Sequence, residues 1–167
     1  MKNFSLYEEC DFIWMTGFFP RDKRNFTAYI ERIKTGENSR EPPLDENVRG
    51  LVEALNELPF LYTMGSGGGR VMSLFREGML VYGDGCWVTF TVNGTSPQSG
   101  RFVAEITKLL QTYKDAHLKP MPQTSLYSYG VTLAVQEDGE EVVAYAGRAT
   151  ARIRNITDFV KKFREGL

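Results

Sequence analysis

The chain has 167 residues and a mass of 19.0 kDa, the size of one domain that buries roughly 70% of its unfolded surface. Hydrophobic residues make up 42% of the chain and charged residues 25%, and 20 basic against 21 acidic side chains leave a net charge of -1. This composition excludes a disordered chain and argues against nucleic-acid binding through bulk charge, although a local basic face stays open.

Cysteine and histidine are scarce. Cys10 and Cys86 are the only cysteines and His117 is the only histidine, whereas a zinc site takes about four such ligands. We expect no metal site, two free thiols that pack rather than react, and an exposed histidine near a helix end. The N-terminus MKNFSLYEECDF carries acids where a signal peptide would be apolar, so we expect a cytoplasmic protein without membrane association.

Helical periodicity recurs along the chain. Apolar residues three and four apart predict helices over residues 22–34, 45–58, 97–115 and 155–165. Asp45 and Asn155 stand where they would cap the second and the fourth helix. The stretch TSPQSGRF supplies capping residues and a first-turn proline to the third.

Strand patterns lie between these helices. Residues 60–64 and 71–75 are predicted to enter and leave a glycine-rich loop. Two hairpins are predicted, one from 79–82 and 86–92 around the turn GDG, the other from 126–135 and 142–153. The sequence therefore predicts a single α+β domain over residues 1–167, with a mainly antiparallel sheet and about four packed helices.

The glycine-rich loop is the strongest candidate site. It consists of Gly65, Ser66, Gly67, Gly68, Gly69 and Arg70. Glycines let backbone N–H groups approach an anion, and the loop adds a hydroxyl and a guanidinium. The segment is neither a P-loop nor a dinucleotide fingerprint, because no Gly-Lys-Ser/Thr ends it and a strand pattern follows it. We predict that it binds a phosphate or carboxylate; a flexible turn between strands is the alternative.

A family resemblance begins just before this loop. The stretch YTMGSGGGR, from Tyr62 to Arg70, resembles the Tyr-Thr-Thr-Ser-Ser-Cys-Ser-Gly-Arg signature of the methyltransferase family of wybutosine synthesis, which modifies phenylalanine tRNA. Five of the nine positions agree, and the upstream stretch PLDENVRGLVEALNELP is similar to the family's helix. The resemblance implies a single α+β domain, S-adenosylmethionine as methyl donor and tRNA, or a nucleotide, as partner.

The motif also departs from the family. Gly67 stands where the family has cysteine, and Met64, Gly65 and Gly68 replace serine or threonine. Losing one transition-state contact costs about a hundredfold in rate, so the resemblance also fits a relative that lost or changed the reaction. Two functions stay open: a tRNA-modifying methyltransferase, and a non-enzymatic binding module whose loop holds an anionic or nucleotide ligand or a partner protein.

Three arginines form a second, weaker candidate. Arg148, Arg152 and Arg154 share one face of the predicted strand and its exit under period two, as a row that contacts nucleic-acid phosphates would. A solvated outer sheet face, balanced by acidic residues of the same hairpin, is the alternative that we favour.

Overall fold

The computed structural model describes residues 19–35, 44–68, 74–76, 79–81, 85–122 and 127–167. Along these residues the elements are α2 (Phe19–Thr35), α3 (Glu46–Asn56), β1 (Leu61–Gly68), β2 (Leu74–Arg76), β3 (Met79–Val81), β4 (Cys86–Val92), α4 (Pro97–Leu110), β5 (His117–Pro120), β6 (Ser128–Ala134) and α5 (Val142–Glu165). No helix in this part of the chain is long and apolar enough to cross a membrane.

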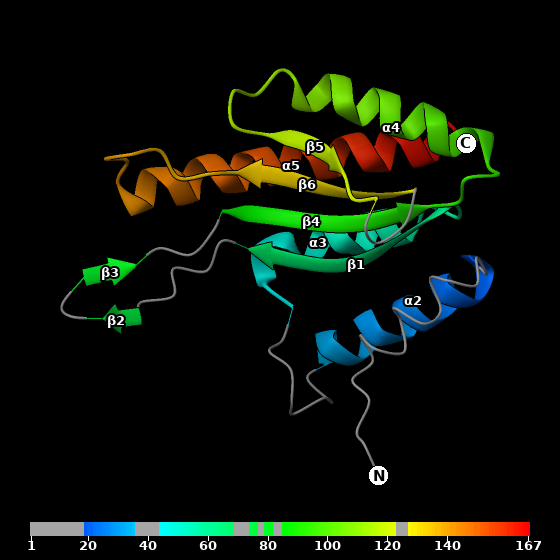
Figure 1. Ribbon diagram of the computed structural model, residues 1–167, viewed down its shortest axis with the longest axis horizontal. Helices are drawn as coiled ribbons and strands as arrows, with labels where there is room; N and C mark the ends of the chain where they lie inside the picture. The colour runs from blue at the N-terminus through cyan, green and yellow to red at the C-terminus, as the bar shows by residue number, and fades with distance from the viewer. Residues whose placement is uncertain (1–18, 36–43, 69–73, 77–78, 82–84, 123–126) are drawn as a thin grey trace, which may run out of the picture.

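Four strands form an antiparallel sheet in the order β1-β4-β6-β5, while β2 and β3 pair separately with each other. Figure 1 shows α3 and α5 behind the four-stranded sheet, α4 above them and α2 along the outer side of β1. This confirms the predicted α+β fold with a mainly antiparallel sheet. The predicted helices 22–34, 45–58 and 97–115 correspond to α2, α3 and α4, of which α4 ends five residues early.

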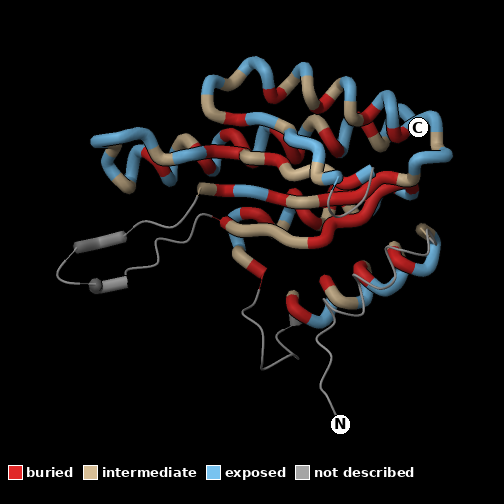
Figure 2. Tube along the Cα trace, in the orientation of Figure 1, coloured by how far each residue is buried: buried red, intermediate tan, exposed pale blue. Residues whose placement is uncertain are grey.

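The core lies between the sheet and the helix layer. Alternate residues of β4, among them Val88 and Phe90, are buried against α3 and α5 (Figure 2). Phe102 of α4 joins the layers, because its ring lies 6.0 Å from that of Phe90 and 5.2 Å from that of Phe163 on α5. Each such side chain contributes about 1.5 to 3 kcal/mol on full burial, so this face supplies most of the stability.

Helix α2 packs against Tyr62 of β1, on the sheet face opposite α3 and α5. The Phe26 ring stacks on that of Tyr62 at 4.9 Å. The Lys23 ammonium donates hydrogen bonds to three carbonyl oxygens where α3 ends and β1 begins, those of Asn56, Leu58 and Leu61, at 2.9, 2.6 and 2.5 Å. Burial lowers the pKa of Lys23 to about 8. These contacts hold α2 against the start of β1.

The predicted strand 142–153 is wrong, because these residues form the first half of α5. Buried Tyr145, Ala149 and Ile153 are four residues apart and continue in Ile156, which is the spacing of one helix face. Asn155 consequently lies inside α5 and does not cap it. Adjacent valines at the start favoured a strand, but the longer helical stripe determines the structure.

The predicted pairing of 79–82 with 86–92 is also wrong. Strand β3 pairs with β2, since both edges of β4 are already occupied by β1 and β6. Gly85 shows how closely the start of β4 packs, because a Cβ atom there would lie 2.0 Å from the backbone oxygen of Ala134.

An ion-pair cluster joins the start of α5 to the rest of the fold. Asp115, after α4, pairs with Arg148 and Arg152. Its carboxylate also accepts the N–H of Val135 at 3.1 Å, and Arg148 reaches Glu140 at 2.6 Å. Burial alone would raise the pKa of Asp115, but the Val135 N–H and the two guanidinium groups lower it to about 2.

We predict that Asp115→Asn lowers the free energy of unfolding by about 2 kcal/mol at pH 7, because it removes the carboxylate that pairs with buried Arg152 and leaves Arg148 with Glu140. The folded-state pKa lies below the ordinary 3.8, so this stability is present above about pH 4 and is lost as the pH falls toward 2. Denaturant unfolding at both pH values, with the exposed Asp158→Asn as control, measures it. An equal deficit at pH 2 and pH 7 would contradict this electrostatic role.

Candidate ligand-binding face

The predicted glycine loop is largely strand. Gly65, Ser66, Gly67 and Gly68 extend β1 and pair with β4, so their placement in a loop is wrong. Gly69 and Arg70 lie outside the described residues, and anion binding by residues 65–70 stays a prediction. Ser66 stands opposite Val88 on the helix side of the sheet.

Gly68 anchors the end of β1 to the start of α3. Its N–H donates to Asp45 Oδ2 at 2.7 Å, and its carbonyl oxygen accepts from Asn47 Nδ2 at 2.6 Å. Asp45 stands at the N-cap position as predicted, but its side chain makes no capping hydrogen bond. A Cβ atom on Gly68 would lie 2.0 Å from Asn47 Oδ1. Glycine is needed here for a close structural contact.

A β-bulge decides which face the other glycines occupy. The pairing of β1 with β4 shifts register between Thr63 and Gly65, which makes Met64 the extra residue. In a regular strand Thr63 and Gly65 would share a face. The bulge instead turns Gly65 and Gly67 away from the helices.

On the sheet face opposite α3 and α5, α2 covers Tyr62, and beyond Tyr62 two rows of residues run across the four strands. We call these two rows the open face. One row runs through Gly67, Trp87, Thr132 and His117. The next row runs through Gly65, Thr89, Gly130 and Lys119. Glycines and short hydroxyl side chains leave this surface flat, with one large aromatic residue on it.

Trp87 lies across the two glycines of β1. A Cβ atom on Gly67 would be 2.5 Å from the indole Nε1, and one on Gly65 would be 3.4 Å from Cζ3. Both ends of the indole therefore occupy space that side chains would fill at these positions. Trp87 nevertheless keeps 38% of its surface exposed. The glycines thus seat an aromatic ring against the strand while part of it stays accessible to a ligand.

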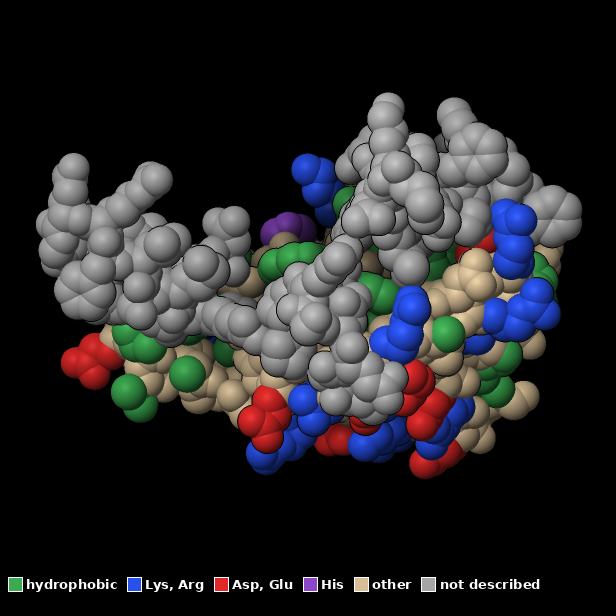
Figure 3. Space-filling view, turned by 90° about the horizontal axis from the view of Figure 1, so that it is seen from below, with side chains coloured by type: hydrophobic (Ala, Val, Ile, Leu, Met, Phe, Trp, Pro, Cys, Tyr) green, Lys and Arg blue, Asp and Glu red, His purple; other side chains and the backbone are tan. Residues whose placement is uncertain are grey.

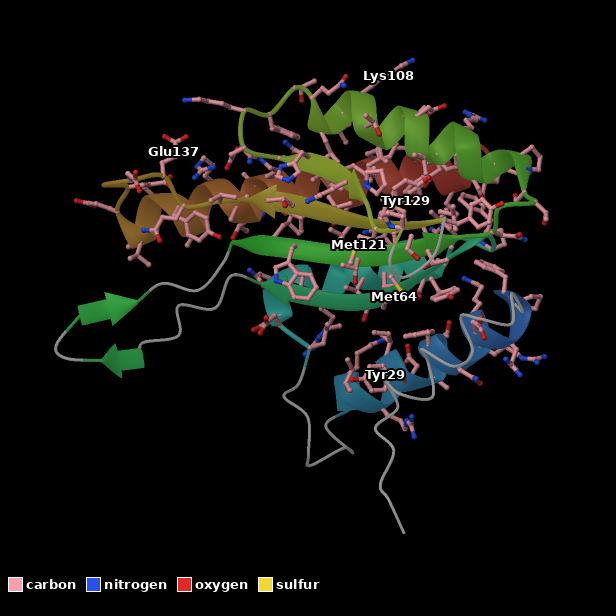
Figure 4. All side chains as sticks on the ribbon, in the orientation of Figure 1. Tyr29, Met64, Lys108, Met121, Tyr129 and Glu137 are labelled. Atoms are coloured by element: carbon pink, nitrogen blue, oxygen red, sulfur yellow. The ribbon has the colours of Figure 1, made fainter. Side chains whose placement is uncertain are left out.

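An open groove of about 590 Å³ runs beside Trp87. Its lining includes Thr89, Thr132, His117 and Lys119, and none of the described residues that line it is acidic. His117 lies in β5 rather than at a helix end, and its Nε2 is 3.3 Å from the hydroxyl of Thr132. In the described part of the chain, the groove therefore combines an aromatic ring, hydroxyl groups and an ammonium group. Figure 4 labels Met121, another lining residue, beside the middle of the sheet.

The predicted arginine row is not present on the sheet. Arg148, Arg152 and Arg154 belong to α5, where residues two apart point to different sides. Arg148 and Arg152 pair with Asp115, and Arg152 is buried. Arg154 is exposed on the helix. The prediction that these three arginines share one face of a strand is therefore wrong.

Cys86 is a buried free thiol at the start of β4. Burial raises the pKa of its thiol, and its Sγ lies 3.1 Å from the carbonyl oxygen of Gly68. A buried thiol that stays protonated is a poor nucleophile. Within the described residues, no three His, Cys, Asp or Glu side chains are grouped as metal ligands.

Comparison with protein families, curated proteins and solved structures found no match. The wybutosine resemblance rests on the motif residues and the upstream helix stretch, and within that motif Thr63 is buried and its hydroxyl accepts a hydrogen bond from Asn56 Nδ2 at 2.6 Å.

Sequence reasoning missed Trp87, Thr132 and Lys119 as a group. The alternation in CWVTFTV carries part of the signal, because it sets Trp87 and Thr89 on the face opposite Val88. The partners on β5 and β6 become neighbours only through strand pairing.

We predict that Gly67→Val displaces the Trp87 indole, because even its Cβ would come within 2.5 Å of Nε1. In a Trp14→Phe background Trp87 is the sole tryptophan, so its fluorescence maximum reports the change directly. A red shift with a stability loss of about 1 to 3 kcal/mol is expected. Gly147→Ala, where nothing lies within 4 Å, is the control. An unchanged Trp87 spectrum would contradict this seating of the indole.

Proposed function

We propose that the protein is a binding module whose open face holds an anionic ligand with a planar ring, a nucleotide in chemical class. The observation that carries this proposal is that the partly exposed Trp87 and Lys119 line the same groove. None of the described residues that line this groove is acidic. Aromatic side chains bind bases by stacking, and an ammonium group binds phosphate.

The charge around the groove supports an anionic ligand over a neutral one. Elsewhere basic and acidic side chains are interleaved, as along the lower side of the view in Figure 3. Within the groove, Lys119 has no acidic neighbour among the described lining residues. A phosphate bound there is attracted by the Lys119 ammonium, and no described lining residue repels it.

Hydroxyl groups complete the site. Thr89 and Thr132 flank Trp87 on the same face and line the groove. A threonine hydroxyl both donates and accepts hydrogen bonds, which suits the sugar and the base edges of a nucleotide. Stacking contributes about 1 to 3 kcal/mol and a charge-assisted hydrogen bond about 1.5 to 3 kcal/mol, which together correspond to a dissociation constant near the millimolar range.

The methyltransferase hypothesis adds one specific ligand. S-adenosylmethionine, the donor implied by the motif resemblance, carries an adenine ring and a carboxylate, although its sulfonium and ammonium groups make it a net cation. It therefore belongs in the same titration as the nucleoside monophosphates. Methyl transfer would require an acceptor as well, so donor binding alone supports the binding module and leaves the reaction a prediction.

We expect AMP and GMP to bind with millimolar affinity by isothermal titration calorimetry. Trp87→Ala should weaken binding roughly 5- to 150-fold through lost stacking, and Lys119→Glu should weaken it by charge reversal. Lys108→Glu is the matched control, since Lys108 is exposed on α4 and points away from the sheet (Figure 4).

Two results would contradict the proposal. One is no binding of any nucleotide, or of S-adenosylmethionine, at millimolar concentration. The other is equal loss in Lys119→Glu and Lys108→Glu, which would indicate bulk charge instead of a site. Thermal unfolding of each variant checks that the fold is retained.

A further inference from the structure

We infer that the ligand of the open face is a single strand of nucleic acid, several nucleotides long, rather than a free nucleotide. This inference rests on the proposed function and names the ligand class of the same site. It comes from the spacing of Trp87 and Lys119, the openness of the groove and the exposure of the indole.

Trp87 and Lys119 stand at separate places on the open face. Trp87 stands on β4, opposite Thr132 of β6, and Lys119 stands on β5, two strands away and in the next row. Strand separation and rise per residue place their Cα atoms about 12 Å apart. The indole extends over Gly65 and Gly67 of β1, away from β5. A strand with one base on Trp87 therefore presents a neighbouring phosphate to Lys119 more readily than a single nucleotide presents its own.

Among the described residues, the groove lies on the surface of the sheet rather than in an enclosed cavity. Small-molecule sites are concave and enclose most of their ligand, whereas this groove lies over a flat floor that includes Gly130, Thr89 and Thr132. A free nucleotide would leave much of its surface in water here. A polymer gains affinity from contacts spread over several units, so it needs no enclosing pocket.

The aromatic ring favours a single strand over a duplex. Trp87 can stack only on a base whose face is free, and duplex bases cover one another's faces. Its indole is held against Gly65 and Gly67, so it presents a fixed platform and loses little side-chain entropy on binding. The hydroxyl groups of Thr89 and Thr132 lie beside this platform, where sugars and base edges would pass.

The charge of the groove determines how strongly salt weakens oligonucleotide binding. Each phosphate that is neutralised on a single strand contributes about -0.7 to the slope of log K against log salt. With Lys119 as the cation of the groove, the slope should be shallow, near -0.7. Lys119→Ala should bring the slope close to zero while base stacking persists.

Fluorescence anisotropy with a labelled single-stranded oligonucleotide of about eight residues tests the inference, with AMP and a duplex of the same sequence as competitors. We expect the oligonucleotide to bind at least about tenfold more tightly than AMP, and the duplex to compete weakly. Trp87→Ala should reduce oligonucleotide affinity roughly 5- to 150-fold, and Lys108→Glu should leave it unchanged.

The outcomes separate the two proposals. If the oligonucleotide binds no more tightly than AMP and both depend on Trp87, the strand inference is wrong and the nucleotide module stands. Duplex binding as tight as single-strand binding would also overturn the strand inference. If neither ligand binds, both proposals fall.

Discussion

The structure depends on a sheet whose two faces are packed differently. One face lies against the large core with α3 and α5, whereas on the other face α2 covers Tyr62 of β1 and leaves Trp87 partly exposed. Val88 and Phe90 of β4 point into a core shared with α3 and α5, while Trp87 and Thr89 point the other way. Antiparallel sheets tolerate this division, because alternate side chains lie on opposite faces. Alternate residues of the same strands therefore form the main core and the open face.

The bulge at Met64 determines which face of the sheet Gly65 and Gly67 occupy. Without it, Gly65 and Gly67 would face the helices, where the absence of side chains would leave voids. With it, they lie beneath the Trp87 indole on the open face. Gly68 at the end of the strand is held by Asp45 and Asn47 instead. One glycine-rich segment thus serves two purposes, anchoring α3 and seating an aromatic ring.

The sequence predicted what depends on local periodicity. The α+β fold and helices α2, α3 and α4 follow from apolar stripes, whereas the start of α5 was misassigned because Val142 and Val143 favour strands locally. The open face depends on pairing between distant strands and on a bulge, neither of which single-strand patterns reveal. Glycines read as loop residues are strand residues, because Trp87 supplies the side chain that packs there.

The most direct test of the open face as the binding site is an NMR titration of ¹⁵N-labelled protein with the single-stranded oligonucleotide, in a Trp14→Phe background. Trp87 then gives the sole indole N–H signal. The signals of this indole and of the Gly67, Thr132 and Lys119 amides should shift together, while the outward residues of α5 stay unchanged. Shifts confined to the helix layer, or an unmoved Trp87 indole in the presence of bound oligonucleotide, would contradict the assignment of ligand binding to this face.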